Sequence, residues 1–243
     1  MTKRQKIRKS MILISFFLFP ATFYYMSPYL IIEASVQGVV NGSFIIFSIL
    51  FISSLFSGRV FCGWVCPAGG VQETIIPINS QRIARGRMLK WVIWLPWMTT
   101  IIIAAFRAGG YDRVDFFYQT TRGLSIGNIQ ALITYMLVLL LIVTPTLTIG
   151  RRSFCHYICW MAPFMVIGRK VRNLVRLPSL QLNAENSKCI HCHACTNHCP
   201  MSLPVENMVK DNTMETTDCI LCGTCIDVCK SKVFQYEYKR PST

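Results

Sequence analysis

CIHCHACTNHCP at residues 189–200 and CILCGTCIDVCK at residues 219–230 decide how the chain is organised. Each run holds four cysteines in the spacing C-x2-C-x2-C-x3-C. Three thiolates of such a run can hold three corners of a 4Fe-4S cubane, and the fourth ligates the other cluster of the pair. The pattern therefore predicts cluster I on Cys189, Cys192, Cys195 and Cys229, and cluster II on Cys219, Cys222, Cys225 and Cys199.

Other uses of these cysteines fit the spacing less well. Pro200 follows the first run, as in bacterial ferredoxins, which this segment closely resembles. A zinc ribbon separates two C-x2-C pairs by a longer spacer. Cys189, Cys192 and His193 also match the C-x-x-C-H signature of c-type haem attachment, but the longer pattern already uses both cysteines. We therefore expect the histidines of this segment to be solvated loop residues.

The composition predicts a membrane protein that works in a reducing compartment. Of 243 residues, 52% are hydrophobic and only 15% are charged, which is too apolar for an ordinary soluble domain. All twelve cysteines fall into patterned pairs or quartets, which favours metal ligation over disulfides. The net charge of +14 comes mostly from basic residues beside apolar segments, so we expect contact with membrane lipid and no nucleic-acid partner.

Four apolar segments, residues 11–32, 39–56, 91–106 and 129–149, are the predicted transmembrane helices. Pro20 and Pro28 are expected to kink or end the first. Basic residues gather between the second and third segments and after the fourth: Arg82, Arg85, Arg87, Lys90, Arg151, Arg152, Arg169, Lys170, Arg172 and Arg176. The positive-inside rule then predicts a multi-pass protein with both termini in the cytoplasm. Residues 163–177 have the mixed composition of an interfacial helix.

A second set of cysteines forms an internal repeat. GRVFCGWVCP at residues 58–67 is echoed by GRRSFCHYIC at residues 150–159, and each C-x3-C pair follows an even-numbered span. Parallel repeats of this kind could bring both pairs to one site. Cys62, Cys66, Cys155 and Cys159 could ligate an iron–sulfur centre or another metal, form redox-active dithiols, or pack as small buried hydrophobes. We favour shared metal ligation, because core cysteines have no reason to pair.

The fold class predicted from these patterns is an α-helical membrane domain joined to an α+β ferredoxin domain. Residues 1–177 would form four transmembrane helices in two parallel repeats, with a juxtamembrane helix at their end. Residues 178–243 would form a cytoplasmic domain that carries two 4Fe-4S clusters.

FCGWVCPAGGVQE at residues 61–73, the second F-C-x3-C at residues 154–159 and the C-terminal cluster motifs resemble the NapH-type membrane polyferredoxins. These are related to NosR and to an oxidase-assembly accessory protein, and the resemblance covers most of the chain. It implies a component of a quinol dehydrogenase at the bacterial inner membrane, with the quinone pool and other redox subunits, iron–sulfur or cytochrome proteins, as partners. One position departs from the family pattern, because Trp160 stands where a second C-x3-C-P proline is expected.

Two functional hypotheses follow. The first is an electron-transfer subunit that passes electrons between the quinone pool and a redox partner through 4Fe-4S clusters. The second is an assembly or maturation factor, in which the C-x3-C thiols reduce a metal or a thiol on a client metalloenzyme. No carboxylate lies inside an apolar segment, so the sequence identifies no quinone ligand.

Overall fold

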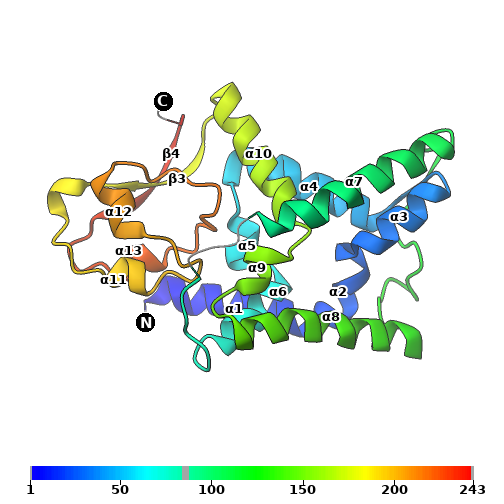
Figure 1. Cartoon of the computed structure of the whole chain (residues 1–243), viewed down its shortest axis with the longest axis horizontal. Coiled ribbons are helices and arrows are strands. Elements are labelled where there is room, and N and C mark those ends of the chain that lie inside the picture. The colour runs from blue at the N-terminus through cyan, green and yellow to red at the C-terminus, as the bar shows by residue number, and fades with distance from the viewer. Residues whose placement is uncertain (1, 84–87, 242–243) are drawn as a thin grey trace.

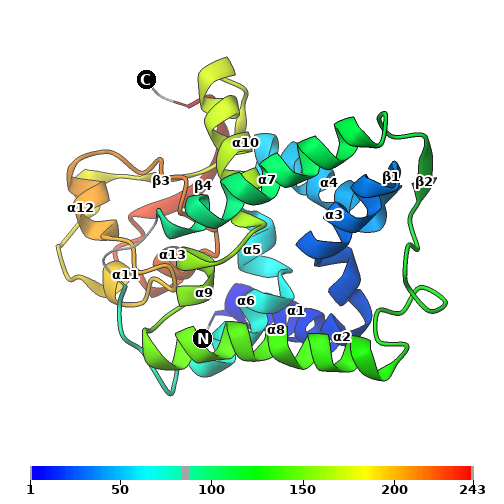
Figure 2. The same ribbon diagram turned by 45° about the vertical axis from the view of Figure 1, so that its right-hand side comes forward.

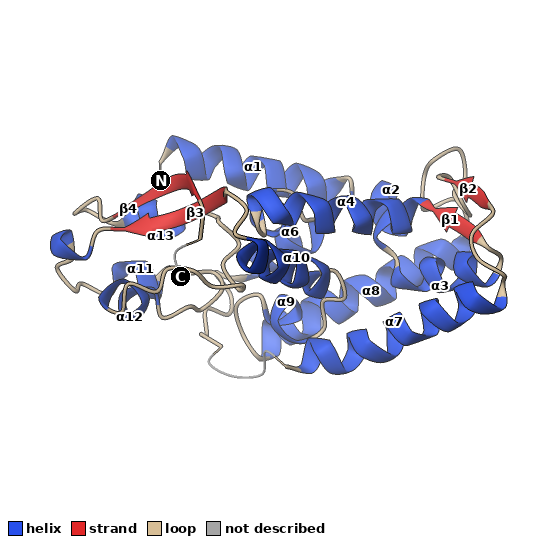
Figure 3. Cartoon of the chain, turned by 90° about the horizontal axis from the view of Figure 1, so that it is seen from above, coloured by secondary structure: helices blue, strands red, loops and turns tan. Residues whose placement is uncertain are grey.

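Helices make up most of the chain (Figure 1), and two short sheets lie at opposite ends of the molecule (Figure 3). The computed structural model describes residues 2–83 and 88–241. Its helices are α1 (Lys3–Phe17), α2 (Phe19–Thr22), η1 (Phe23–Met26), α3 (Pro28–Val36), α4 (Gly42–Ser57), α5 (Val60–Trp64), α6 (Pro67–Ile75), α7 (Leu89–Arg107), α8 (Ile129–Thr148), α9 (Ser153–Tyr157), α10 (Ala162–Val175), η2 (Asn186–Lys188), α11 (Ala194–Asn197), α12 (Val205–Lys210) and α13 (Thr224–Val228). The strands are β1 (Val39–Asn41), β2 (Arg113–Asp115), β3 (Ser179–Ala184) and β4 (Phe234–Lys239).

Two helices in the described part of the chain, α7 and α8, are individually long and apolar enough to cross a bilayer. The first predicted segment is not one helix. Leu18 ends α1, α2 begins with a proline in its first turn, and the α2–η1 pair bends from α1 by 59°. Pro28 begins α3 in the same way, because proline lacks the N–H that a continuing helix needs. By length and composition, the described residues thus hold two candidate spans, or three if the bent pair counts as one, and a four-span topology stays a prediction.

The second predicted segment forms α4, an apolar helix of 16 residues. At 1.5 Å per residue it is shorter than a hydrocarbon core of about 30 Å. Asn41 caps its first turn by accepting a hydrogen bond from the Phe44 N–H, and Gly58 ends it with a φ of +58°. The chain then turns at once into α5, which carries the first cysteine pair.

At the end of the molecule away from the cysteine-rich segment, β1 pairs in parallel with β2, with Val39 opposite Arg113 (Figure 2). At the other end, β3 and β4 form an antiparallel pair in which Ser179 lies opposite Lys239 and Ala184 opposite Phe234. Both cluster motifs lie in the sequence between β3 and β4, so this sheet ties together the two ends of the cysteine-rich segment. Leu182 of β3 and Phe234 of β4 belong to the same buried hydrophobic cluster as Ile220, Leu221 and Val233.

Ion pairs attach the cysteine-rich segment to the helices. Arg4 of α1 contacts Asp227 of α13 at 2.7 Å. Arg169 and Arg172 of α10 were expected at a lipid headgroup surface, but both are 1% exposed and pair with Glu215 at 2.7 Å. The prediction of an interfacial position is therefore wrong for these two side chains. The topology argument also used Arg85 and Arg87, which lie outside the described residues.

Candidate metal centres

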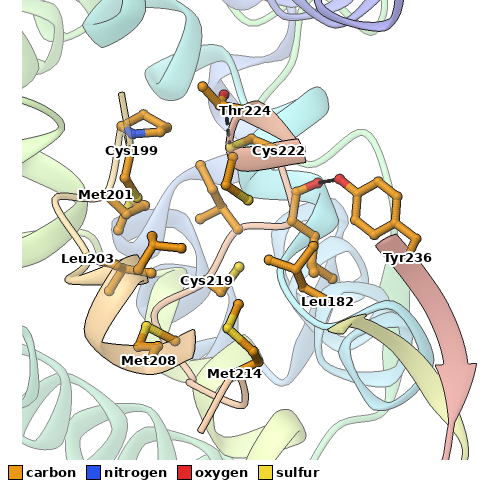
Figure 4. A pocket seen from close by; sticks show the side chains of 16 residues that line it. Leu182, Cys199, Met201, Leu203, Met208, Met214, Cys219, Cys222, Thr224 and Tyr236 are labelled. Carbon is orange, nitrogen blue, oxygen red and sulfur yellow. Dashed lines mark hydrogen bonds between the residues drawn. The ribbon is translucent and has the colours of Figure 1, made fainter. Parts of the chain in front are cut away.

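Four of the predicted cluster ligands, Cys199, Cys219, Cys222 and Cys225, line one cavity of about 30 Å³ (Figure 4). Its other walls are apolar, from Leu182 of β3 and from a set of residues around α12: Met201, Leu203, Val205, Met208 and Met214. Tyr236 of β4 closes one side by donating a hydrogen bond of 2.7 Å to the Leu221 carbonyl. Burial raises the pKa of the Cys199 thiol to about 12.

The other four predicted ligands, Cys189, Cys192, Cys195 and Cys229, line a second, smaller cavity of about 20 Å³. This one lies nearer the surface, because Cys192 is exposed. His191 and His193 are exposed as expected, but both contact the Glu206 carboxylate, His191 at 3.2 Å. Sequence analysis did not identify this carboxylate, whose residue is 4% exposed.

The two cluster motifs have the same backbone shape. His191 and His193 have positive φ in the first run, and Leu221 and Gly223 have positive φ at the matching positions of the second. Left-handed residues at these spacings coil each loop around its cysteines. Within the described ranges, no three His, Cys, Asp or Glu side chains come close enough to hold a single metal ion. Cysteines that surround a cavity suit a multi-iron cluster better than one zinc ion.

A third cavity brings the two C-x3-C pairs together. Cys62, Cys66, Cys155 and Cys159 all line it, each 5 to 7% exposed, and its volume of about 30 Å³ equals that of the cavity around Cys199. Gln72, fully buried on α6, donates a hydrogen bond of 3.2 Å from its Nε2 to the Cys155 Sγ. All four thiols thus line one cavity, and their ligation of a metal stays a prediction.

The repeat extends to the backbone around each pair. The Phe61 carbonyl accepts hydrogen bonds from the N–H groups of Val65 and Cys66, and the Phe154 carbonyl accepts the equivalent bonds from residues 158 and 159. The lengths are 2.9 and 2.9 Å in the first copy and 3.0 and 2.9 Å in the second. Trp160 does not disturb this turn, and its indole Nε1 donates to the Met26 carbonyl at 3.0 Å.

An arginine lies three residues before each pair, and sequence analysis assigned neither of them a role at the cysteines: Arg152 was counted only as a topology charge, and Arg59 was noted only as part of the repeat. Arg59 precedes Cys62, Arg152 precedes Cys155, and both side chains are 0% exposed. Arg59 lies 3.7 Å from Asp218, and Arg152 lies 2.5 Å from Glu73. Aligning the repeat as R-x-F-C-x3-C would have revealed this match.

The carboxylates of this network each serve more than one cation. Glu73 also pairs with Arg8 at 2.7 Å, and Asp218 also pairs with Lys90 at 3.3 Å. Burial alone would raise the pKa of Glu73, but Arg152 and Arg8 outweigh it and hold that pKa below its ordinary value. Four buried cations therefore share the carboxylates of Glu73 and Asp218 near the membrane cysteines.

The third cavity lies directly against the loop of the first. A Cβ on Gly63 would meet the Ile220 carbonyl at 2.4 Å, and Trp64 Nε1 donates to the Leu221 carbonyl at 3.0 Å. α5, which carries Cys62, thus packs on the residues that precede Cys222. Figure 2 shows α5 and α9 between α7 and α8, on the side nearer to α13.

Family models match both cysteine-bearing parts of the chain. A 4Fe-4S binding domain matches residues 42–84 and 130–178, and a 4Fe-4S dicluster domain matches residues 181–230. The first match contains both C-x3-C pairs, and the second contains the two C-terminal runs up to residue 230.

Curated relatives cover most of the chain at low identity. The ferredoxin-type protein NapH of Haemophilus influenzae is 28% identical over 77% of this chain and 65% of its own length. The methylamine utilization ferredoxin-type protein MauN of Paracoccus denitrificans is 28% identical over 82% and 68%. The putative electron transport protein YccM of Escherichia coli is 25% identical over 83% and 57%. No solved structure matches the chain.

Proposed function

The chain belongs to the NapH-type ferredoxin proteins, and from this we propose that it is a membrane-bound electron-transfer subunit that links the quinone pool to a redox partner through iron–sulfur clusters. The relatives are ferredoxin-type and electron transport proteins, and the matched models are 4Fe-4S domains. The partner would be a further iron–sulfur or cytochrome subunit. In this proposal residues 1–177 form the membrane domain and residues 178–243 the ferredoxin domain.

The ligand proposal has three parts. Cluster I would be held by Cys189, Cys192, Cys195 and Cys229, and cluster II by Cys219, Cys222, Cys225 and Cys199, as the two cavities group them. A third centre would be held by Cys62, Cys66, Cys155 and Cys159. Each bound cluster would supply a one-electron carrier whose potential depends on its surroundings.

The observation that carries the proposal is the contact between the membrane cysteines and the cluster II loop. An electron carrier needs its centres in sequence, from the bilayer to the face where a partner docks. Gly63 and Trp64 place the third cavity against the Ile220–Leu221 backbone, and the shared cysteine pattern places cluster II beside cluster I. Cys192 is exposed, so the cluster I end is open to a partner.

Charge supports a metal at the membrane cysteines. Buried ions are costly unless compensated, and the four cations around this cavity share only two carboxylates in the described part of the chain. Neutral thiols or a disulfide would leave this surplus uncompensated. Four thiolates around a metal core leave the centre anionic, which offsets it. The orphaned Nε atoms of Arg59 and Arg152 are further donors without a protein partner.

The arrangement favours electron transfer over the maturation hypothesis. A factor that reduces a client must expose its working thiols, whereas the four membrane cysteines are all buried. We also place the cysteine-rich domain and the N-terminus on the same, cytoplasmic side of the inner membrane. The Arg4–Asp227 pair between α1 and α13 supports this placement.

Metal analysis and a quinol titration test the proposal. Protein purified without oxygen should contain about twelve irons and as much acid-labile sulfide per chain if all three sites hold a cubane, and about eight if only the C-terminal sites do. Low-temperature electron paramagnetic resonance should then show the clusters reduced by a quinol analogue. Clusters that respond to dithionite but not to the quinol would contradict the quinone link.

A further inference from the structure

We infer that Arg59 and Arg152 form a matched pair of fixed positive charges that raises the reduction potential of the membrane centre, and that Asp218 and Glu73 set how much of that charge the centre feels. The inference rests on the proposed ligation of this centre by the four membrane cysteines. It concerns the residues around the ligands rather than the ligands themselves.

Both arginines occupy equivalent places in the repeat. Each is the residue before a five-residue helix, α5 or α9, and each lies three residues before the first cysteine of its pair. Both side chains are 0% exposed. A buried charge of this kind is rarely kept for packing alone, because an apolar side chain of similar volume is often as stable. Its appearance in both copies of the repeat indicates a shared role.

The guanidinium groups lie against the cysteine loops. Arg59 Nη2 is 3.9 Å from the Cys62 Sγ, and Arg152 Nη1 donates a hydrogen bond of 2.7 Å to the Cys62 carbonyl. Arg152 thus crosses from the second repeat to the first. Gly69 makes room for it, because a Cβ there would lie 3.1 Å from Arg152 Nη1.

Each arginine forms an ion pair with one carboxylate. Asp218 lies next to Cys219 of the proposed cluster II, and Arg59 also donates to the Thr217 carbonyl at 3.4 Å. Glu73 on α6 holds Arg152 and is itself held by Arg8. Reduction adds a negative charge to the centre without any proton, so nearby cations favour the reduced state and nearby carboxylates oppose it.

If the side chains act through their charge, arginine and carboxylate variants should shift the midpoint potential of the membrane centre in opposite directions. Removing an arginine charge should lower the midpoint potential of the membrane centre, whereas removing its carboxylate should raise it. A residue that mattered only for packing would not give shifts of opposite sign. Cluster I serves as an internal reference, since none of these four side chains is among its lining residues.

The test is a redox titration of the full chain in detergent, followed by low-temperature electron paramagnetic resonance. Arg59→Gln and Arg152→Gln should each lower the equilibrium constant for one-electron reduction of the membrane centre about tenfold. This corresponds to a midpoint potential lower by about 59 mV. Asp218→Asn and Glu73→Gln should each shift it upward, and Arg59→Lys should stay near the wild type. Arg107→Gln, at an exposed cation, should change nothing.

Several results would overturn the inference. One is a membrane centre whose potential is unchanged in all four charge variants, and another is a shift of the same sign in arginine and carboxylate variants. If Arg59→Gln fails to assemble the centre, Asp218→Asn decides alone, because no rise in potential there refutes the idea. Wild-type protein with iron for the C-terminal clusters only would refute both this inference and the third centre. A membrane centre that is present, but whose midpoint potential is the same in wild type and variants, would refute the inference and leave the third centre standing.

Discussion

Gly63→Ala should separate the membrane cysteines from the cluster II loop. The new Cβ would stand 2.4 Å from the Ile220 carbonyl oxygen, whereas ordinary contact begins at about 3.4 Å. The new Cβ would clash with a backbone carbonyl, which cannot rotate away as a side chain can. The Gly63 and Ile220 segments must therefore move apart by about 1 Å. Overpacking of this size costs about 1–3 kcal/mol. At about 1.4 kcal/mol for each factor of ten, the loop should open about 5 to 150 times more often.

Hydrogen exchange measured by mass spectrometry checks this directly, since exchange reports the free energy of local opening. Peptides that cover residues 217–224 should exchange faster in Gly63→Ala, while iron content stays at the wild-type level. Gly109→Ala is the matched control, because its added Cβ meets nothing within 4 Å and its left-handed φ of +80° confines any strain to an outer loop. Unchanged exchange at residues 217–224 in Gly63→Ala, with all iron retained, would refute the close contact between the two loops.

Three further variants probe the sites. Cys199→Ser should remove the resonance of cluster II and leave that of cluster I, and loss of cluster I instead would reverse the ligand assignment. Cys62→Ala combined with Cys155→Ala should lower iron by about a third, from about twelve to about eight per chain, with an unchanged value excluding a cubane there. Glu215→Gln leaves Arg169 and Arg172 buried without a carboxylate. Docking of the cysteine-rich domain on α10 should therefore weaken by up to about 3 kcal/mol. Limited proteolysis of the variant should be correspondingly faster. Resistance equal to wild type would show that these ion pairs do not hold the domain.

The sequence predicted the grouping of the cysteines far better than the path of the helices. Spacing alone paired Cys199 with the second run, because each four-cysteine loop is a local pattern with a fixed backbone shape. Hydropathy located α7 and α8 within a few residues. Hydropathy alone could not show that residues 11–32 break into several helices, but Pro20 and Pro28 predicted a kink or an end there, and each proline lies in the first turn of a new helix.

The sequence predicted the burial and the partners of the charged side chains least well. The topology argument treats Arg152, Arg169 and Arg172 as charges at the cytoplasmic boundary and leaves Arg59 out, yet all four side chains are 1% exposed or less. Their partners Glu73, Asp218 and Glu215 lie 43 to 159 residues away in the chain, a separation that no local pattern reveals. Only an alignment of the repeat as R-x-F-C-x3-C would have marked Arg59 and Arg152 in advance.

The position of these charges links the stability of the fold to its proposed chemistry. Arg59, Arg152 and Arg169 all lie where the helices meet the cysteine-rich domain, and the carboxylates they hold come from both sides of that boundary. A buried cation surplus destabilises such a boundary unless an anionic group completes it. If ligated metal at the membrane cysteines is that group, then assembly of the centre should also fasten the cysteine-rich domain to the helices. Protein stripped of iron should therefore lose protection from proteolysis at residues 178–188 as well as at the cluster loops, and full protection there without iron would separate docking from metal binding.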